Sequence, residues 1–289
     1  MSARDPEPLR ATEEQRAAVR RRARRRRWLI LALQVAILLL VIGFWEWGSR
    51  TRYDDEHFIV DPFIWSRPSR IWVRVLEWLG DGTVLKNLFI TLYEAAMSFV
   101  LGVLGGVAAG FLLGRSEFWA RVLNPYIQVL NALPRLVFTP IFFILFGLGE
   151  NSKIALGFSL VFFIVFFNAY QGVREVDRNV FNNARMLGAG ERQMTRHVLL
   201  PSAMSWILTS LHTSVGFAMV GAIVGEYLGS SRGLGHIINQ AEGNLDTTGV
   251  FAGLVVLSAV VVVVELAVTW AERRLVRWKP QPAGDLLAA

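Results

Sequence analysis

The residues NNARMLG at positions 182–188, with Pro201 thirteen residues after Gly188, decide the fold of this chain. They are polar and basic, yet apolar segments long enough to cross a membrane lie on both sides of them. The pattern predicts a short helix, a turn at Gly188 that a side chain would obstruct, and a second run that ends or kinks at Pro201. A polar segment between two spans is expected at the membrane surface, where another protein can bind it. The pattern therefore favours a membrane subunit driven by a partner over a self-contained enzyme.

The composition supports a membrane protein. Of the 289 residues, 53% are hydrophobic and the mean hydropathy is +0.41, which a soluble domain of this length seldom reaches without long uncharged runs. The chain has no cysteine, which excludes a disulfide framework, a thiolate zinc site and a cysteine nucleophile.

Six apolar segments are long enough to cross a hydrocarbon core of about 30 Å at about 1.5 Å per helical residue. The sequence therefore predicts an all-α polytopic membrane protein with six transmembrane helices. The third segment is interrupted by Pro134 and Pro140, and a helix that begins at Pro68-Ser69 is expected to lie flat in the outer interface. The six predicted spans cover residues 28–47, 87–113, 125–148, 153–173, 205–228 and 249–271.

Basic residues predict the orientation. A block of arginines at 20–27 directly precedes the first span, which favours a topology anchor in the cytoplasm over a nucleic-acid patch. With six spans both termini are then cytoplasmic, and the short outer loops hold only Lys153 and Arg232. The segment 48–86, with six basic residues, is the exception to this rule. The predicted location is the cytoplasmic (inner) membrane, with contact to membrane lipid and none to nucleic acid.

Small and polar residues inside the spans have two readings each. Gly102, Gly106, Gly110 and Gly114 share one helix face, where they permit close helix packing or form a sliding seam. A carboxylate as deep as Glu94 is expected to face protein or water. Each polar residue alone favours interhelical hydrogen bonding, but as a set they are candidates for a translocation path. The candidates are Glu94, Gln128, Asn131, Asn168, His212 and Ser214.

Motifs for other functions are absent from the sequence. It contains no G-x-x-x-x-G-K-[ST] loop for ATP, no H-E-x-x-H pair and no G-x-S-x-G elbow. The four histidines are scattered, so no metal site and no cofactor are expected, and no residue is a catalytic candidate. A secondary transporter or channel that needs no ATPase remains the alternative function, although no repeated halves are evident.

The segment 182–201 resembles the cytoplasmic EAA loop of binding-protein-dependent ABC importer permeases. Ala184 and Gly188 match the second alanine and the glycine of that pattern, and Val198, Leu200 and Pro201 match its end without a gap. Asn182 and Asn183 replace the glutamate and the first alanine. The residues that the resemblance assigns to ATPase coupling are Asn182, Asn183, Ala184, Arg185, Met186, Leu187, Gly188 and Pro201.

The resemblance extends over about residues 60–278. It includes GEYLGSSRGLG at 225–235, NP at 124–125 and ERRLVRW at 272–278, and it is to the subfamily that serves nitrate, taurine, alkanesulfonate and thiamine-precursor importers. It implies the type I (MetI-like) importer fold, a second permease copy in a homodimer, cytoplasmic ABC ATPase subunits that bind the ATP, and an extracytoplasmic solute-binding protein. The substrate implied is a small solute, favoured to be an anion.

The expected organisation has four parts. They are a cytoplasmic arginine-rich segment at 1–27, the first span and outer interfacial segment at 28–86, a permease core at 87–278 with its coupling loop at 174–204, and a cytoplasmic tail at 279–289.

Overall fold

The computed structural model describes residues 13–52 and 58–275, and within these ranges every element of length is a helix. The chain forms two compact units, Met1–Arg70 and Ile71–Ala289. The predicted tail at 279–289 and the first twelve residues of the segment 1–27 lie outside the described residues.

The first unit contains a long helix and a short one. Helix α1, Glu13–Arg50, covers the first predicted span, and within this unit its apolar side chains from Trp28 to Phe44 are exposed, as in Trp28 at 63% and Leu40 at 72%. Helix α2, Pro62–Trp65, begins at Asp61, whose carboxylate accepts the N–H of Phe63. The apolar surface of α1 suits a helix surrounded by lipid rather than by water.

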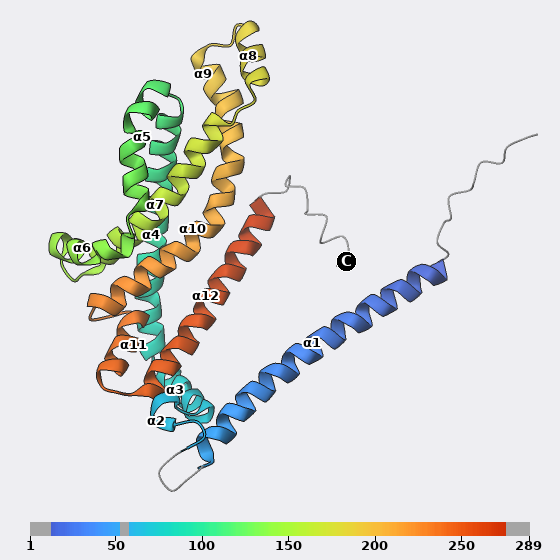
Figure 1. Cartoon of the computed structure of the whole chain (residues 1–289), viewed down its shortest axis with the longest axis vertical. Helices are drawn as coiled ribbons and strands as arrows, with labels where there is room; N and C mark the ends of the chain where they lie inside the picture. The colour runs from blue at the N-terminus through green and yellow to red at the C-terminus, as the bar shows by residue number, and fades with distance from the viewer. Residues whose placement is uncertain (1–12, 53–57, 276–289) are drawn as a thin grey trace, which may run out of the picture. The chain divides into compact units, whose positions relative to one another are not determined.

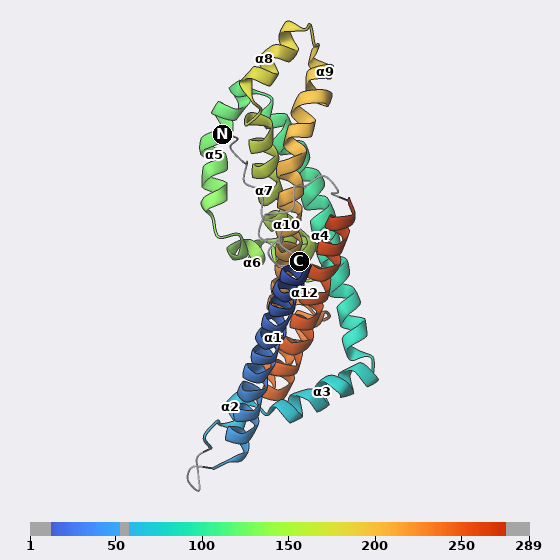
Figure 2. The ribbon, with the colours of Figure 1, turned by 90° about the vertical axis from the view of Figure 1, so that its right-hand side faces the viewer.

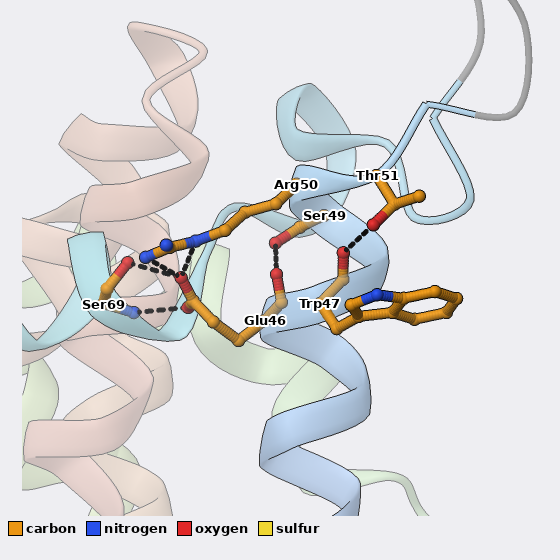
Figure 3. A network of polar contacts seen from close by, with 6 residues as sticks. All are labelled: Glu46, Trp47, Ser49, Arg50, Thr51 and Ser69. Atoms are coloured by element: carbon orange, nitrogen blue, oxygen red, sulfur yellow. Dashed lines mark hydrogen bonds and ion pairs between the residues drawn. The ribbon is translucent and has the colours of Figure 1, made fainter.

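A carboxylate fastens the end of α1 to the chain that follows it (Figure 3). Glu46 accepts hydrogen bonds from the Ser69 N–H at 3.0 Å and the Ser69 hydroxyl at 2.9 Å, and it pairs with Arg50 at 2.6 Å. Close by, the Val60 N–H donates to the Gly48 carbonyl at 3.1 Å. These contacts hold the first residues of helix α3, Pro68–Gly80, against the end of α1.

The second unit is built on a three-helix core that runs from one end of the unit to the other (Figure 1). The three core helices are α4, Thr83–Gly114, α7, Glu150–Arg174, and α10, Leu200–Gly229. They meet in a core of small and branched residues that includes Ala95, Val161, Val165, Ala218 and Ala222. Helix α12, Thr247–Leu275, packs beside α10 and beside α11, Leu234–Gly243.

Glycines on α4 bring its backbone against α7. A Cβ on Gly102 would lie 2.6 Å from Val161 Cβ, and one on Gly106 would lie 2.7 Å from the Phe162 carbonyl oxygen. Gly110 and Gly114 meet the next two turns of α7 in the same way. The sequence-based expectation of close packing along this face is confirmed.

The third predicted span is not a single straight helix. Helix α5, Glu117–Ala132, begins eight residues before the predicted start and includes Pro125, and a 3-10 turn, η1 (Arg135–Phe138), follows it. Helix α6, Thr139–Phe146, starts with Pro140 in its first turn, where the missing N–H costs nothing. The pair bends by 84°, so five helices qualify as spans by length and composition and this bent pair is the sixth candidate.

Short helices occupy the two ends of the second unit (Figures 1 and 2). Helices α8, Arg178–Met186, and α9, Glu191–Met194, lie at one end, which we call the α8 end. Helix α11, Leu234–Gly243, lies at the opposite end, which we call the α11 end, together with α3, Pro68–Gly80. The start of α3 at Pro68 confirms that prediction, whereas α11 falls in a segment expected to be a loop.

Candidate functional site

The predicted coupling loop forms a protruding hairpin of helices at the α8 end (Figure 1). Asp177 starts α8 by accepting the N–H of Asn179 at 2.7 Å, and the helix ends at Leu187. Gly190 precedes α9, where its N–H donates to the side chain of Gln193 at 3.0 Å. The segment therefore has defined secondary structure in this chain alone.

Gly188 is required by its backbone conformation and not by crowding. Its φ is +80°, and nothing lies within 4 Å of a Cβ built on it. The Ala189 N–H donates to the Ala184 carbonyl and the Gly188 N–H to the Arg185 carbonyl, both at 3.0 Å. This is the Schellman arrangement that ends a helix with glycine in the left-handed region. The prediction of a turn at Gly188 is confirmed, but the expected steric obstruction is wrong.

The tip of this hairpin exposes apolar side chains. Met186 is 79% exposed and Leu187 is 88% exposed, the highest value among the large hydrophobic residues described. The guanidinium of Arg185 lies over the Phe181 ring at 5.3 Å. Asn182 and Asn183, at the positions that depart from the family pattern, are also exposed. An exposed apolar pair beside a basic side chain is suited to binding a protein groove.

A second apolar cluster joins the hairpin to the core helices. Ala169 and Val173 of α7 pack with Met194 of α9 and with Ala203 and Ile207 of α10. The partly buried side chains of Phe181, Ala184 and Ala189 contact this cluster from the hairpin. The cluster therefore connects the hairpin to both α7 and α10.

Pro201 does not end a helix, so the prediction that the second run stops at this residue is wrong, whereas a kink into the fifth span stays a prediction. Helical structure continues from Glu191 through Gly229, with the π-helical turn η2, Thr195–Leu199, immediately before α10. A proline ring clashes with the carbonyl four residues earlier in a regular α-helix. The wider π turn accommodates that clash, so the chain enters α10 without a break.

The six predicted path residues lie in different surroundings. Glu94 and Ser214 are 1% and 0% exposed, inside the helix core of the unit. Gln128 and Asn131 are exposed on α5, where Asn131 accepts a hydrogen bond from Arg135 at 2.6 Å. Asn168 donates to the Ile164 carbonyl at 2.8 Å, and His212 lies 2.7 Å from Glu265 of α12. Their assignment to a translocation path stays a prediction.

A cluster of buried polar side chains lies near the α11 end, and the sequence did not predict how they pair. Glu226 of α10 accepts from the Thr91 hydroxyl of α4 at 2.6 Å and from the Gly235 N–H at 2.8 Å. The Thr91 hydroxyl in turn accepts from the Leu234 N–H at 3.0 Å, and Asn87 accepts from Gly233 at 2.7 Å. Side chains of α4 and α10 thus cap the first turn of α11.

Lys153 belongs to the same region, although the sequence places it in an outer loop. It is 0% exposed and lies in the first turn of α7. Its ammonium donates to the carbonyls of Leu148, Gly149 (3.0 Å) and Gly229 (2.8 Å), and it also interacts electrostatically with Glu94 and Glu226. The loop prediction for Lys153 is wrong, because its burial depends on the Gly229 carbonyl and on Glu94 and Glu226, which are remote in sequence.

The glycines of the segment 225–235 make room for these contacts. A Cβ on Gly225 would lie 2.8 Å from Lys153 Cγ, and one on Gly229 would lie 2.7 Å from the Phe143 ring. Gly233 has φ of +102°, and a Cβ on Gly235 would lie 2.9 Å from Glu226 Cβ. The family resemblance includes this segment, but only the fold shows that its glycines surround Lys153 and Glu226.

Known membrane transport proteins are similar to this chain in sequence. Residues 102–277 match the family described as binding-protein-dependent transport system inner membrane component. A putative aliphatic sulfonates transport permease of Bacillus subtilis, SsuC, is 35% identical over 221 residues, covering 76% of this chain and 80% of that protein. The taurine transport system permease TauC of Escherichia coli is 28% identical, covering 86% and 90%.

The solved structures give the same fold. An amino acid ABC transporter with histidines contains a chain that superposes with a TM-score of 0.57 at 21% identity, covering 70% of this chain and 98% of that one. The chain described here belongs to the family of binding-protein-dependent transport system inner membrane components. It is a multi-pass inner-membrane protein, and it is the permease of an ABC importer with the all-α fold expected for one.

Proposed function

We propose that two copies of this chain form the membrane path of an importer for a small organic anion of the sulfonate class. The family supports the importer, and the names of SsuC and TauC, which refer to aliphatic sulfonates and taurine, support the substrate class. The ATP is bound and hydrolysed by separate cytoplasmic subunits, so this chain contributes no catalytic residue and no cofactor site. An extracytoplasmic binding protein delivers the solute at the α11 end.

The observation that carries this proposal is the exposed hairpin of α8 and α9. Met186 and Leu187 form its tip, and its inner side packs into the cluster shared by α7 and α10. An ATPase that binds the tip and moves on ATP binding would displace both core helices together. The alternative of a channel or secondary transporter gives no role to an apolar tip that faces away from the core.

The test is capture of the ATPase by the intact permease. Leu187→Asp places a charge in the proposed contact, and because the side chain is 88% exposed the substitution should not disturb folding. Leu245→Asp is the matched control, since Leu245 is 74% exposed at the α11 end and its φ of +54° is one that aspartate tolerates. We expect Leu187→Asp to lower co-purification of the ATPase and ATP-dependent uptake at least tenfold, and Leu245→Asp to retain co-purification of the ATPase.

Equal ATPase capture by the two variants would refute the docking role of the hairpin. Uptake that persists after ATP depletion, with the ion gradient maintained, would favour the secondary transporter instead.

A further inference from the structure

A polar cavity of 670 Å³ opens at the α11 end of the second unit, between α3, the start of α4 and α11. Its size falls in the range of small-molecule sites. Its polar and aromatic lining includes Trp78, Lys86, Asn87, Arg232, His236 and Gln240. We call it the basic cavity, because Arg74, Lys86 and Arg232 line it.

Asp246, the acidic side chain that lines this cavity, already has a cationic partner. Asp246 pairs with Arg74 at 2.5 Å, and its second oxygen accepts the Gly249 N–H at 3.0 Å at the start of α12. Arg74 also pairs with Glu77 at 3.3 Å. These groups hold α3 against the turn before α12, and with one cation and two carboxylates the three together carry one net negative charge.

Two other cations in the cavity remain available. Within the described residues, neither Lys86 nor Arg232 has a carboxylate oxygen within 4.0 Å. Asp81 attracts Lys86 electrostatically, but its carboxylate accepts the Thr83 N–H at 2.8 Å and caps α4. Both cations are solvent-exposed at the rim of a concave surface, where they can pair with an incoming anion.

A neighbouring cavity has the opposite character. It measures 330 Å³ and shares Ile90, Ser231 and Arg232 with the basic cavity, but its lining includes Glu94 and Glu150. Carboxylates there oppose the entry of an anion, so the favourable position for one is on the Lys86 side of Arg232. The first N–H groups of α11 do not contribute, since Asn87, Thr91 and Glu226 already accept from them.

We propose that the basic cavity is a binding site for a small oxyanion of the sulfonate class, with Lys86 and Arg232 as its charged ligands. The inference rests on the proposed function for the substrate class and adds a location on the permease itself. The anion pairs with the ammonium and the guanidinium, while the amides of Asn87 and Gln240 line the remaining polar surface.

The test uses the full chain in nanodiscs of neutral phosphatidylcholine, with trifluoromethanesulfonate as the probe and its ¹⁹F relaxation as the readout. We expect saturable binding that weakens at least tenfold in Lys86→Gln and in Arg232→Gln and stays within about threefold in Lys86→Arg. Arg192→Gln removes the same charge at the α8 end and should have no effect. The neutral probe trifluoroethanol should not bind.

Absence of saturable binding to the unaltered chain, or equal binding by Lys86→Gln and Arg192→Gln, would overturn the proposal. If Lys86→Gln instead weakened only capture of the binding protein, the cavity would be a docking surface and the anion site would be refuted. Should Arg232→Gln fail to fold, Lys86→Gln decides the question, because Lys86 is exposed. Failure of this site would leave ATP-driven uptake and ATPase capture intact, so it is distinguishable from failure of the proposed function.

Discussion

Glu226 connects three helices through a single carboxylate, which is 1% exposed. It accepts from Thr91 of α4 and from Gly235 at the start of α11, and it belongs to α10 itself. Buried polar groups that lose a partner cost more than the net value of the bond they made. Glu226 therefore connects α4, α10 and α11 by hydrogen bonds, and we call this connection the structural tie.

Removing this tie should destabilise the second unit. We expect Glu226→Ala to lower the free energy of unfolding by about 3 kcal/mol, because the Thr91 hydroxyl and the Gly235 N–H lose their acceptor. Glu117→Ala is the control, since Glu117 is 74% exposed in its pair with Arg121 at the start of α5 and its removal should cost within about 1 kcal/mol. Thermal unfolding of both variants in detergent measures the difference, and equal midpoints would contradict the tie.

Asp81 gives a pH dependence at the start of α4. The Thr83 backbone N–H that it accepts lowers the pKa of this carboxyl below its usual value. A carboxyl with a lowered folded pKa stabilises the helix start above its unfolded pKa, and that stabilisation is lost as the pH falls through the folded pKa. We expect amide-exchange protection of residues 83–86 to be constant above the ordinary aspartate pKa of about 3.9 and to fall as the pH drops below it, where the carboxyl becomes protonated. In Asp81→Asn the protection factors should not change over this pH range, and a parallel fall there would exclude Asp81 as the cause.

At the scale of elements, the contact between α4 and α7 depends on the glycine face of α4. Gly106 abuts the backbone of α7, whereas a Cβ on its neighbour Gly105 would meet only side-chain atoms of Phe162 and Phe158, at 3.3 Å and 3.4 Å. Backbone cannot move aside as a side chain can. The two positions therefore form a matched pair for testing helix packing.

We expect Gly106→Ala to lower the free energy of unfolding by about 1–3 kcal/mol through overpacking. Gly105→Ala should be close to neutral, since the phenylalanine rings can shift and alanine favours the helix. Denaturation of the two purified variants would show the order, and a Gly105→Ala variant that is the less stable of the two would contradict this packing.

Much of the element structure could be predicted from sequence because it depends on local pattern. The length of the apolar segments predicted α1, α4, α7, α10 and α12, and Pro68 predicted the start of α3. The helix α11 could not be predicted, since its first turn is capped by Asn87, Thr91 and Glu226 from other helices. The same holds for Lys153, whose burial depends on Gly225 and the Gly229 carbonyl of α10. Continuity at Pro201 depends on a π turn that residue spacing does not specify.

At the scale of the whole second unit, α7 and α10 both contribute residues to the α8 end and to the α11 end. Their α8 ends share the apolar cluster with the hairpin, and their α11 ends share the contacts of Lys153 and Glu226. Next to Lys153, the Ile154 carbonyl of α7 accepts a hydrogen bond from Ser98 of α4 at 3.2 Å. The two ends are thus linked through one packed body, which suits a subunit that converts movement at one membrane face into opening at the other.

The central claim is that the α8 and α11 ends lie on opposite sides of the membrane, with the hairpin in the cytoplasm. The absence of cysteine from the sequence makes single-cysteine labelling direct. With a membrane-impermeant maleimide, we predict that Leu187→Cys reacts only in inverted vesicles and Leu245→Cys only in right-side-out vesicles. Labelling of Leu187→Cys from the outer face would contradict the account.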